Sequence, residues 1–239
     1  MKIKMVGTGS MITKRNPACY LINDKIMIDL PNGIVKVLKK ADLFDRVEYV
    51  FITHMHGDHI FDLPFLFLDR VQTDRKLTVV LSKRWFKKLK KLVKLAFPRQ
   101  YYNVFYNSKI EFIDNKNIPN IDSLNIERIE VSHGSMKPSY GYIFKENNKI
   151  VTFTGDTCLC NNIIDASKES DYMICDCTLK IGNEKHIGVD NIKFLLKNNP
   201  NLKIVPSHTS INSKECLSKI NNKNLIIKED MEEIIIWVK

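Results

Sequence analysis

The segment that most constrains the fold of this chain is residues 53–59, which have the sequence Thr-His-Met-His-Gly-Asp-His. The segment follows a predicted strand at Glu48–Ile52. In an extended chain, side chains two residues apart point to the same side, so the imidazoles of His54 and His56 can reach one ion. Divalent metals in proteins favour imidazole and carboxylate ligands. The segment therefore predicts a metal centre at the end of a strand.

The second half of the same segment extends the predicted site. Gly57 lets the chain turn sharply, after which Asp58 and His59 can face a neighbouring ion. The alternative is a surface loop with accidental histidines. That alternative is disfavoured, because three of the chain's six histidines fall within this one segment.

Three further candidate ligands each follow a predicted strand elsewhere in the chain: His133, Asp156 and His208. Taken alone, each histidine would be interpreted as an ordinary core or surface residue, and Gly155-Asp156 as a turn. Functional groups of α/β proteins gather at the ends of strands. Beside the first segment, we therefore predict that all three belong to the metal centre.

The rest of the chain predicts a layered α/β fold. Apolar runs rich in Ile, Val and Phe, bounded by turn residues, are typical of strands; they occur at Lys2–Val6, Tyr20–Ile22, Ile26–Asp29, Val47–Thr53, Thr78–Leu81, Ile110–Ile113, Ile126–Val131, Gly141–Phe144, Ile150–Thr154, Tyr172–Asp176, Lys203–Pro206 and Ile234–Val238. Helical periodicity occurs at Gly33–Ala41, Leu63–Val71, Lys83–Phe97, Val189–Lys197 and Ser213–Ile220. This order predicts two mixed sheets covered by helices, in one domain that spans residues 1–239.

In type and order, the candidate ligands resemble the motifs of the metallo-β-lactamase superfamily, and the resemblance covers nearly the whole chain. It includes the Gly-rich turn at Gly7–Ser10, the strand that ends in Asp29 with Gly33 nearby, and a closing strand around Lys228–Ile234. The resemblance implies a four-layer αββα sandwich and a metal-dependent hydrolase. It also implies the division of ligands: His54, His56 and His133 for one ion, Asp58, His59 and His208 for the other, and Asp156 bridging both.

Two bound ions imply a definite chemistry. Zn is the first expectation, although Mn and Fe accept the same ligands. The resemblance implies that a hydroxide bridging the ions is the nucleophile, because paired ions bring the pKa of water from about 15.7 to near neutrality. Asp58 is then a catalytic group as well as a ligand. Asp29 is a candidate to orient an imidazole, or it caps the turn after its strand.

The sixth histidine, His186, is not needed by either ion. The segment Asp176-Cys177-Thr178, followed by His186 just before a predicted helix, is similar to the ribonuclease Z branch of the superfamily. That branch usually has Glu in place of Asp176 and Ser-Thr after the histidine. The resemblance implies that Asp176 orients His186 and that His186 protonates the leaving oxygen. The alternative is a helix-capping or surface histidine.

The predicted substrate is a small anionic ester, with a phosphodiester as the first choice. Only 22 residues separate His133 from Asp156, and they predict one hairpin around Asn147-Asn148. Ribonuclease Z enzymes often carry a tRNA-clamping arm at that place. A tRNA 3′ endonuclease therefore stays an alternative, as does a lactone, thioester or sulfate ester hydrolase. A non-catalytic metal-binding or nucleic-acid-binding module is disfavoured, because all seven ligands are present.

The formal charge of +10 keeps a nucleic acid open as a substrate or partner. The predicted helix at 83–97 carries five lysines largely on one face; a solvated face is the first interpretation, and a basic lip for nucleic acid or contact with a membrane surface are the alternatives. No apolar run approaches the roughly 20 residues needed to cross a bilayer, and the chain starts without a signal-peptide pattern. We expect a cytoplasmic protein without membrane association, for which a homodimer is possible.

The six cysteines include two pairs with the spacing Cys-x-Cys, Cys158 with Cys160 and Cys175 with Cys177. Zinc knuckles usually have the spacing Cys-x2-Cys. We therefore interpret the cysteines as reduced, buried thiols and keep a second metal site as the lesser alternative.

Overall fold

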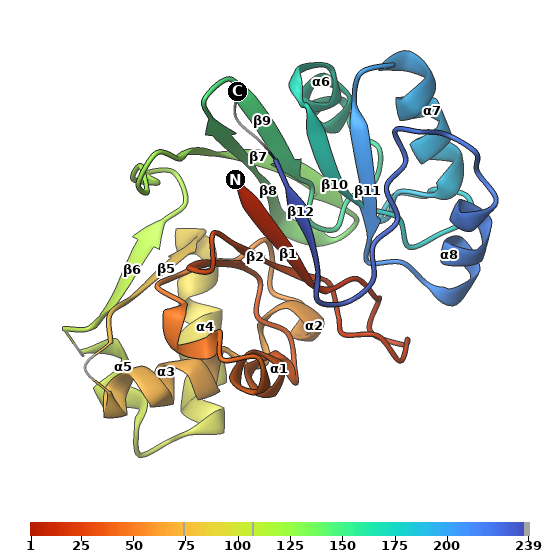
Figure 1. The fold of residues 1–239 in the computed structure, drawn as a ribbon. Helices are drawn as coiled ribbons and strands as arrows, with labels where there is room; N and C mark the ends of the chain where they lie inside the picture. The colour runs from red at the N-terminus through yellow and green to blue at the C-terminus, as the bar shows by residue number, and fades with distance from the viewer. Residues whose placement is uncertain (74, 107, 237–239) are drawn as a thin grey trace.

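The computed structural model describes residues 1–73, 75–106 and 108–236, in which two mixed sheets face each other (Figure 1). The seven-stranded sheet has the order β12-β1-β2-β3-β4-β5-β6, and the five-stranded sheet has the order β11-β10-β9-β8-β7. The first consists of β1 (Lys2–Gly7), β2 (Cys19–Ile22), β3 (Ile26–Ile28), β4 (Tyr49–Phe51), β5 (Leu77–Leu81), β6 (Ile110–Asp114) and β12 (Glu232–Ile235). The second consists of β7 (Asn125–His133), β8 (Met136–Glu146), β9 (Lys149–Phe153), β10 (Tyr172–Asp176) and β11 (Lys203–Ser207).

Helices cover the outer faces of both sheets (Figure 1). On the seven-stranded sheet these are α1 (Ile34–Lys40), α2 (Gly57–Ile60), α3 (Leu63–Gln72), α4 (Phe86–Ala96) and α5 (Tyr101–Phe105), with 3-10 turns η1 (Phe44–Arg46) and η2 (Lys83–Trp85). On the five-stranded sheet they are α6 (Asn161–Glu169), α7 (Val189–Asn198) and α8 (Ile211–Ser218). The predicted αββα sandwich is therefore confirmed.

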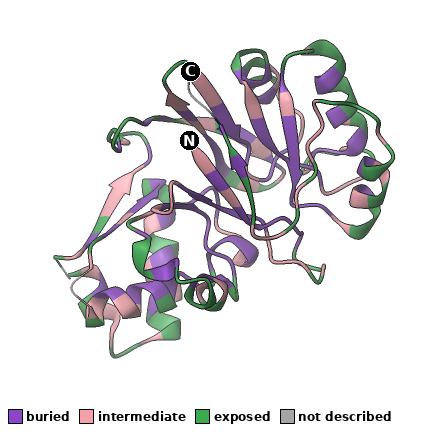
Figure 2. Cartoon of the chain, viewed as in Figure 1, coloured by how far each residue is buried: buried purple, intermediate pink, exposed green. Residues whose placement is uncertain are grey.

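Strand alternation produces the layers. Successive side chains of a strand point to opposite faces, so Val50 of β4 contacts the helices while Phe51 enters the core between the sheets. On β10, Met173 faces the helices and Ile174 faces inward. In the central core, the ring of Phe51 meets that of Tyr142 edge-on at a centroid distance of 5.1 Å. Figure 2 shows the result: buried strands inside, and helices exposed only on their outer sides.

Several boundaries differ from the predicted ones. The helix α6 was not predicted, because its segment is mostly polar. The helix predicted at Ser213–Ile220 begins two residues earlier, since the hydroxyl of Ser210 caps it by accepting from the amide of Ser213 at 3.1 Å. The C-terminal strand begins at Glu232 and pairs antiparallel with β1; residues 237 and 238 of the prediction lie outside the described residues.

The topology brings strand ends together at one edge of the sandwich. The parallel strands β9, β10 and β11 end side by side, and the ends of β3 and β4 belong to the facing sheet. The predicted hairpin of β8 and β9 is confirmed, with Asn147 and Asn148 at φ 45° and 63° in its turn. In the described part of the chain, no helix combines the length and apolar content that a membrane span requires.

Candidate metal centre

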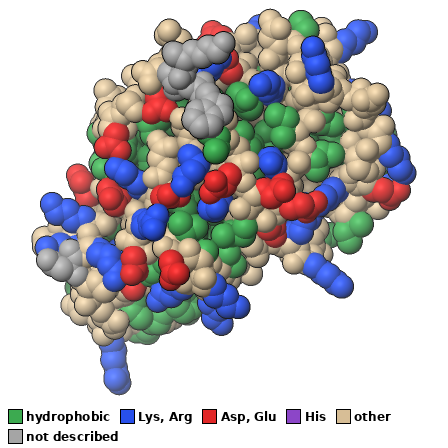
Figure 3. All heavy atoms as spheres, viewed as in Figure 1, with side chains coloured by type: hydrophobic (Ala, Val, Ile, Leu, Met, Phe, Trp, Pro, Cys, Tyr) green, Lys and Arg blue, Asp and Glu red, His purple; other side chains and the backbone are tan. Residues whose placement is uncertain are grey.

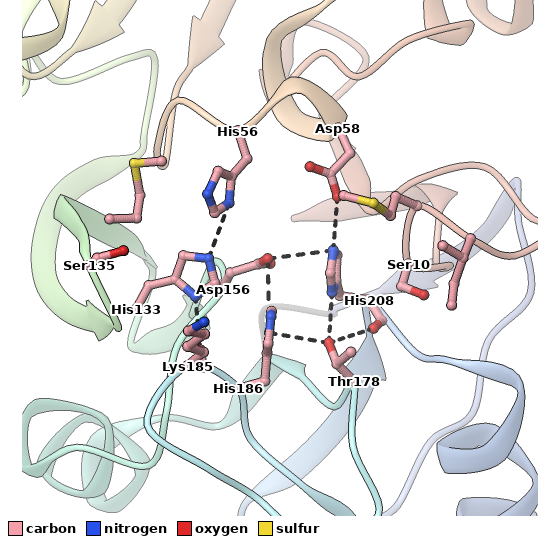
Figure 4. A pocket seen from close by; sticks show the side chains of 13 residues that line it. Ser10, His56, Asp58, His133, Ser135, Asp156, Thr178, Lys185, His186 and His208 are labelled. Carbon is pink, nitrogen blue, oxygen red and sulfur yellow. Dashed lines mark hydrogen bonds and ion pairs between the residues drawn. The ribbon is translucent and has the colours of Figure 1, made fainter.

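The first predicted triad converges on one point. Nε2 of His54 lies 3.0 Å from Nδ1 of His56, which lies 3.2 Å from Nε2 of His133. The ligand nitrogens of all three residues lie within 4.8 Å of one another. His56 follows β4 and His133 ends β7, so the two sheets contribute from opposite sides of the cleft (Figure 4). Three imidazole nitrogens facing one another at these distances suit a shared cation.

The second predicted triad lies beside the first. Oδ2 of Asp58 is 3.4 Å from Nε2 of His208, and His59 completes a group whose ligand atoms lie within 4.8 Å. Oδ1 of Asp58 and Nε2 of His59 are buried and have no hydrogen-bond partner among the residues that the structure describes. Buried polar atoms without partners are costly. A divalent cation at this place would satisfy both atoms, so the residues present fit a metal ion.

Asp156 lies between the two triads. Its Oδ2 is 3.5 Å from Nε2 of His59 and 3.5 Å from Nε2 of His208. It also forms a group with His54 and His59 whose ligand atoms lie within 4.8 Å. The preceding Gly155 has φ +59°, and a Cβ there would lie 2.8 Å from the carbonyl oxygen of Tyr140. Glycine therefore allows the close turn that brings Asp156 to the centre.

Hydrogen bonds on the first sheet fix which ring nitrogen faces the centre. Oδ2 of Asp29 accepts from the hydroxyl of Thr53 at 2.7 Å and from Nδ1 of His59 at 2.7 Å. The Thr53 oxygen in turn lies 3.0 Å from Nδ1 of His54. With Nδ1 acting as donor in both histidines, Nε2 is the nitrogen left free to bind a cation. Asp29 thus occupies the orienting position that the sequence had left open.

The second sheet orients its histidines in a similar way. The hydroxyl oxygen of Thr178 lies 2.7 Å from Nδ1 of His208 and 2.8 Å from Oδ1 of Asp176. Nδ1 of His133 lies 2.9 Å from the backbone oxygen of Lys185. Both imidazoles therefore keep Nε2 for the centre. Neither threonine role was predicted; Thr53 adjoins His54 in the first segment, and Thr178 belongs to the segment that resembles the ribonuclease Z branch.

The charges of the metal-free centre are strongly coupled. Burial alone would lower the pKa of His59, but Asp156 and Asp29 outweigh it and raise that pKa well above its ordinary value. Burial would raise the pKa of Asp156, but the charges of His208 and His59 hold it well below its ordinary range. For His54, burial and the charge of His59 lower the pKa well below the usual value. The centre without metal therefore holds protons that a bound cation would replace.

Asp176 and His186 also come together as predicted. Nδ1 of His186 lies 2.9 Å from Oδ2 of Asp176, which is fully buried, whereas the His186 side chain is 19% exposed. Nδ1 is 4.0 Å from Oδ2 of Asp156. His186 also belongs to two groups of possible metal ligands, one with His133 and Asp156 and one with Asp176 and His208. Burial lowers the pKa of His186, but the hydrogen bond and charge of Asp176 more than offset it, and the pKa is raised.

The centre opens into a cleft of about 360 Å³. Ten of its lining residues are labelled in Figure 4. Ser10 of the cleft belongs to the predicted Gly-rich turn, whereas Met11, Ile12, Ser135, Met136 and Lys185 were not singled out by the sequence analysis. Met11 and Ile12 are 65% and 81% exposed, and their loop is held to the strand end after His208 by the hydrogen bond from the amide of Ser10 to the Thr209 oxygen at 3.2 Å.

The position of Lys185 is set by the hairpin that carries His133. The amide of Gly134 donates to the oxygen of Glu184 at 3.1 Å, and a Cβ at Gly134 would lie 2.8 Å from Cγ of Lys185. The aliphatic stem of Lys185 therefore lies directly across Gly134. Its ammonium has no ion pair within the described residues. Adjacency to His186 was the only signal in the sequence.

The cysteines do not join the centre. Cys175 and Cys177 are buried in the outer core of the second sheet, where burial raises the pKa of both thiols. Within the described residues, no group of possible metal ligands includes a cysteine. All six are free thiols; Cys19, Cys175 and Cys177 are buried as the first interpretation expects, whereas Cys158, Cys160 and Cys216 are only half-buried.

Comparison with known proteins agrees with this geometry. A sequence profile of the family described as "Anti-Pycsar protein Apyc1" matches residues 1–231. Ribonuclease Z of Saccharolobus solfataricus is 27% identical over 220 residues, which cover 72% of this chain and 74% of that protein. The metallo-β-lactamase fold protein YhfI of Bacillus subtilis superimposes with a TM-score of 0.78 at 15% identity, covering 98% of both chains. A diphosphatase of the PhnP family superimposes with a TM-score of 0.75 at 14% identity, covering 99% of this chain and 98% of the other. The predicted resemblance to the metallo-β-lactamase superfamily is confirmed.

Proposed function

We propose that this chain, which belongs to the family of the anti-Pycsar protein Apyc1 and is a metal-dependent hydrolase with the metallo-β-lactamase fold, cleaves phosphodiesters. The reaction would use two divalent ions, and Zn²⁺ is the metal that we expect first. The observation that carries this proposal is the position of Asp156, 3.5 Å from His59 and from His208 and in reach of His54. One carboxylate shared by two ligand triads is the arrangement that two neighbouring ions need.

We expect one set of ligands for each ion, namely His54, His56 and His133 for the first, Asp58, His59 and His208 for the second, and Asp156 for both; both triads are among the groups whose ligand atoms lie close together. When bound, such ions would lower the pKa of a bound water and would polarise the phosphoryl oxygen of the substrate. The imidazoles are already oriented through Asp29 and Asp176. A preorganised ligand set reduces the reorganisation that the reaction requires.

His186 is our candidate for the group that protonates the leaving oxygen. Asp176 fixes its Nδ1 at 2.9 Å, which leaves Nε2 to carry the transferred proton. The raised pKa of His186 increases the fraction of protonated imidazole near neutral pH. Asp176 acts through His186 and is a positioning residue.

Lys185 is our candidate for binding a non-reacting oxygen of the substrate. Its ammonium lines the cleft without an ion pair among the described residues, and its stem is held against Gly134. A fixed cation beside the centre favours a substrate that keeps a negative charge, as a phosphodiester does, over a neutral ester or lactone. The exposed Met11 and Ile12 add an apolar surface to the cleft.

A tRNA 3′ endonuclease is the second candidate. It is favoured by the ribonuclease Z relatives and by the pairing of Asp176 with His186. Against it, the chain between His133 and Asp156 forms only the hairpin of β8 and β9, which leaves no room for a clamping arm there.

A substrate panel on metal-reconstituted protein tests the proposal. The panel contains bis-nitrophenyl phosphate, cyclic nucleotides, a precursor tRNA and a lactone, each also assayed with the Asp156→Ala variant. We expect turnover of phosphodiesters that the variant loses. Cleavage of precursor tRNA alone would favour the second candidate, and turnover of the lactone alone would contradict a phosphodiesterase.

We also propose that residues 1–239 act as one domain. The core between the sheets joins Ile3 and Ile234 from the ends of the chain to Phe153 and Val205 from its second half. A core shared in this way is expected to unfold in one cooperative transition.

A further inference from the structure

Most of the net charge of the chain comes from one short segment. Residues 83–99, which form η2, α4 and the turn after it, contain eight Lys and Arg and no Asp or Glu. The rest of the chain has 29 Lys and Arg against 27 Asp and Glu. None of the eight cations forms an ion pair with a described residue. By contrast, the face of the molecule in Figure 3 shows cations and acids interspersed.

The cations of α4 project outward because its apolar side is used for packing. Leu89 and Val93 are buried in the core beneath the first sheet. Lys87, Lys91 and Lys94 are exposed, and their spacing of four and three residues places them in one stripe along the helix. Because the apolar side is already buried, the helix cannot insert it into a membrane surface.

Exposed aromatic rings adjoin this stripe. Tyr102 and Tyr106, on and just after α5, are 68% and 77% exposed, and their rings stack at a centroid distance of 6.0 Å and an angle of 21°. The ammonium of Lys94 lies 6.0 Å from the ring centroid of Tyr101, so the tyrosines lie next to the cations. Exposed rings beside a row of cations suit unpaired bases, which stack on such rings while the cations neutralise their phosphates.

A second cavity continues the basic surface from the start of α4 toward the catalytic cleft. It has a volume of about 390 Å³, and its charged lining residues are Lys83, Arg84, Lys116 and Arg128 with Asp114 and Glu130. The guanidinium of Arg128 lies 4.8 Å from the ring centroid of Tyr140. Pro138 lines this cavity and Met136 lines the catalytic cleft, so the same strand, β8, borders both.

We propose that the lysine stripe of α4, the tyrosine pair and this cavity form a docking surface for single-stranded nucleic acid. The lysines neutralise successive phosphates, Tyr102 and Tyr106 stack on bases, and the cavity accepts a further phosphate. A duplex offers no unpaired base to the tyrosines, so a single strand is the better ligand. Docking at this surface does not depend on hydrolysis or on the metal centre, and its test therefore stands apart from that of the proposed function.

The test measures binding of a fluorescent single-stranded DNA of about 16 nucleotides by anisotropy, at salt concentrations from about 50 to 200 mM. The test variant combines Lys87→Gln, Lys91→Gln and Lys94→Gln. A matched control combines Lys193→Gln, Lys197→Gln and Lys223→Gln, three exposed lysines away from the proposed surface. Both variants lose the same charge, so a purely non-specific attraction would weaken equally in both. Hydrolysis of bis-nitrophenyl phosphate and the thermal midpoint show that each variant is folded.

We expect the α4 variant to bind more weakly and its plot of log K against log salt to flatten by about 0.7 for each lysine removed, while the control stays close to wild type. The combined substitutions Tyr102→Ala and Tyr106→Ala should weaken the binding of single-stranded DNA by about fivefold or more and leave the binding of a duplex of the same length unchanged. Equal losses in the α4 and control variants would overturn the proposal. So would tighter binding of the duplex, or α4-dependent binding of phosphatidylserine vesicles without binding of the oligonucleotide.

Discussion

The hydroxyl oxygen of Thr178 lies 2.7 Å from Nδ1 of His208. The same oxygen lies 2.8 Å from Oδ1 of Asp176, so carboxylate, hydroxyl and imidazole form a chain that ends at the metal centre. On the facing sheet, Thr53 stands in the same relation to His54, with Nδ1 at 3.0 Å. Each sheet thus uses a threonine to hold one ligand imidazole, although neither threonine would contact a metal.

Thr178→Val should weaken metal binding while leaving the fold intact. The substitution keeps the shape of the side chain but removes the group that fixes Nδ1 of His208, and loss of such an outer partner typically costs about 10- to 100-fold in metal affinity or activity. Competition with a chromophoric chelator measures the affinity. Thr178→Ser, which keeps the hydroxyl, is the control and should restore most of it. Wild-type affinity in the valine variant would show that the hydroxyl has no orienting role.

Asp156→Ala should abolish activity and lower the metal content from close to two ions per chain. The substitution removes a carboxylate that lies within reach of both triads. Elemental analysis after reconstitution measures occupancy, and Asp165→Ala, at an exposed position on α6, is the matched control. A variant that kept both ions and its turnover would contradict the bridging role.

His186→Ala should reduce the rate by roughly 10²- to 10⁴-fold without changing the metal content. Its Nδ1 is occupied by Asp176, so the residue is a proton donor in our scheme and not a ligand. The loss should be smaller for a nitrophenolate leaving group, which departs without a proton, than for an alkoxide. Equal losses on both substrates, or loss of metal, would rule out the role as an acid.

Lys185→Met should raise KM by roughly tenfold with little change in kcat, because a charge-assisted hydrogen bond to the substrate is lost. Methionine keeps an unbranched stem to lie across Gly134. The increase of KM with salt should also be weaker in the variant than in the wild type. Lys137→Met, at an exposed lysine on β8, is the control. An unchanged KM in the Lys185 variant would exclude substrate anchoring by this residue.

Metal binding should release protons near neutral pH. In the metal-free protein the pKa of His59 is raised, since Asp156 and Asp29 outweigh the effect of burial, and Asp156 likewise raises the pKa of His208 against burial. Stability from a raised histidine pKa is fully present below the unfolded value of about 6.5 and is lost as pH rises through the folded pKa. As the pH rises through the folded pKa of these histidines, the metal-free protein should therefore lose stability, while its affinity for metal increases. Calorimetry in buffers of different ionisation enthalpy counts the protons; no buffer dependence at pH 7 would contradict the assignment.

The fold was predictable where burial follows a regular pattern. Strands such as β4 and β10 bury both faces, one against helices and one against the opposite sheet, so they appear in the sequence as short continuous apolar runs. Where burial is partial, the pattern failed. The helix α6 buries only Ile163, Ala166 and Ser167, and so few apolar positions in a mostly polar segment were not recognised as a helix.

The candidate metal ligands could be named from the sequence itself. His54, His56, Asp58 and His59 are neighbours in the chain, so their proximity needs no tertiary structure. His133, Asp156 and His208 could be added because the ends of strands in layered sheets meet at one edge.

Only the tertiary structure decided how these ligands are used. Which nitrogen of each imidazole faces the centre depends on partners brought from other strands, as with Asp29 for His59 and Thr178 for His208. The place of Lys185 depends on Gly134, 51 positions earlier in the chain. The physical reason is that hydrogen bonds and packing act over a few ångströms in space. Residue types and local spacing determine which groups can bind a metal, whereas their orientation is set by contacts between distant segments.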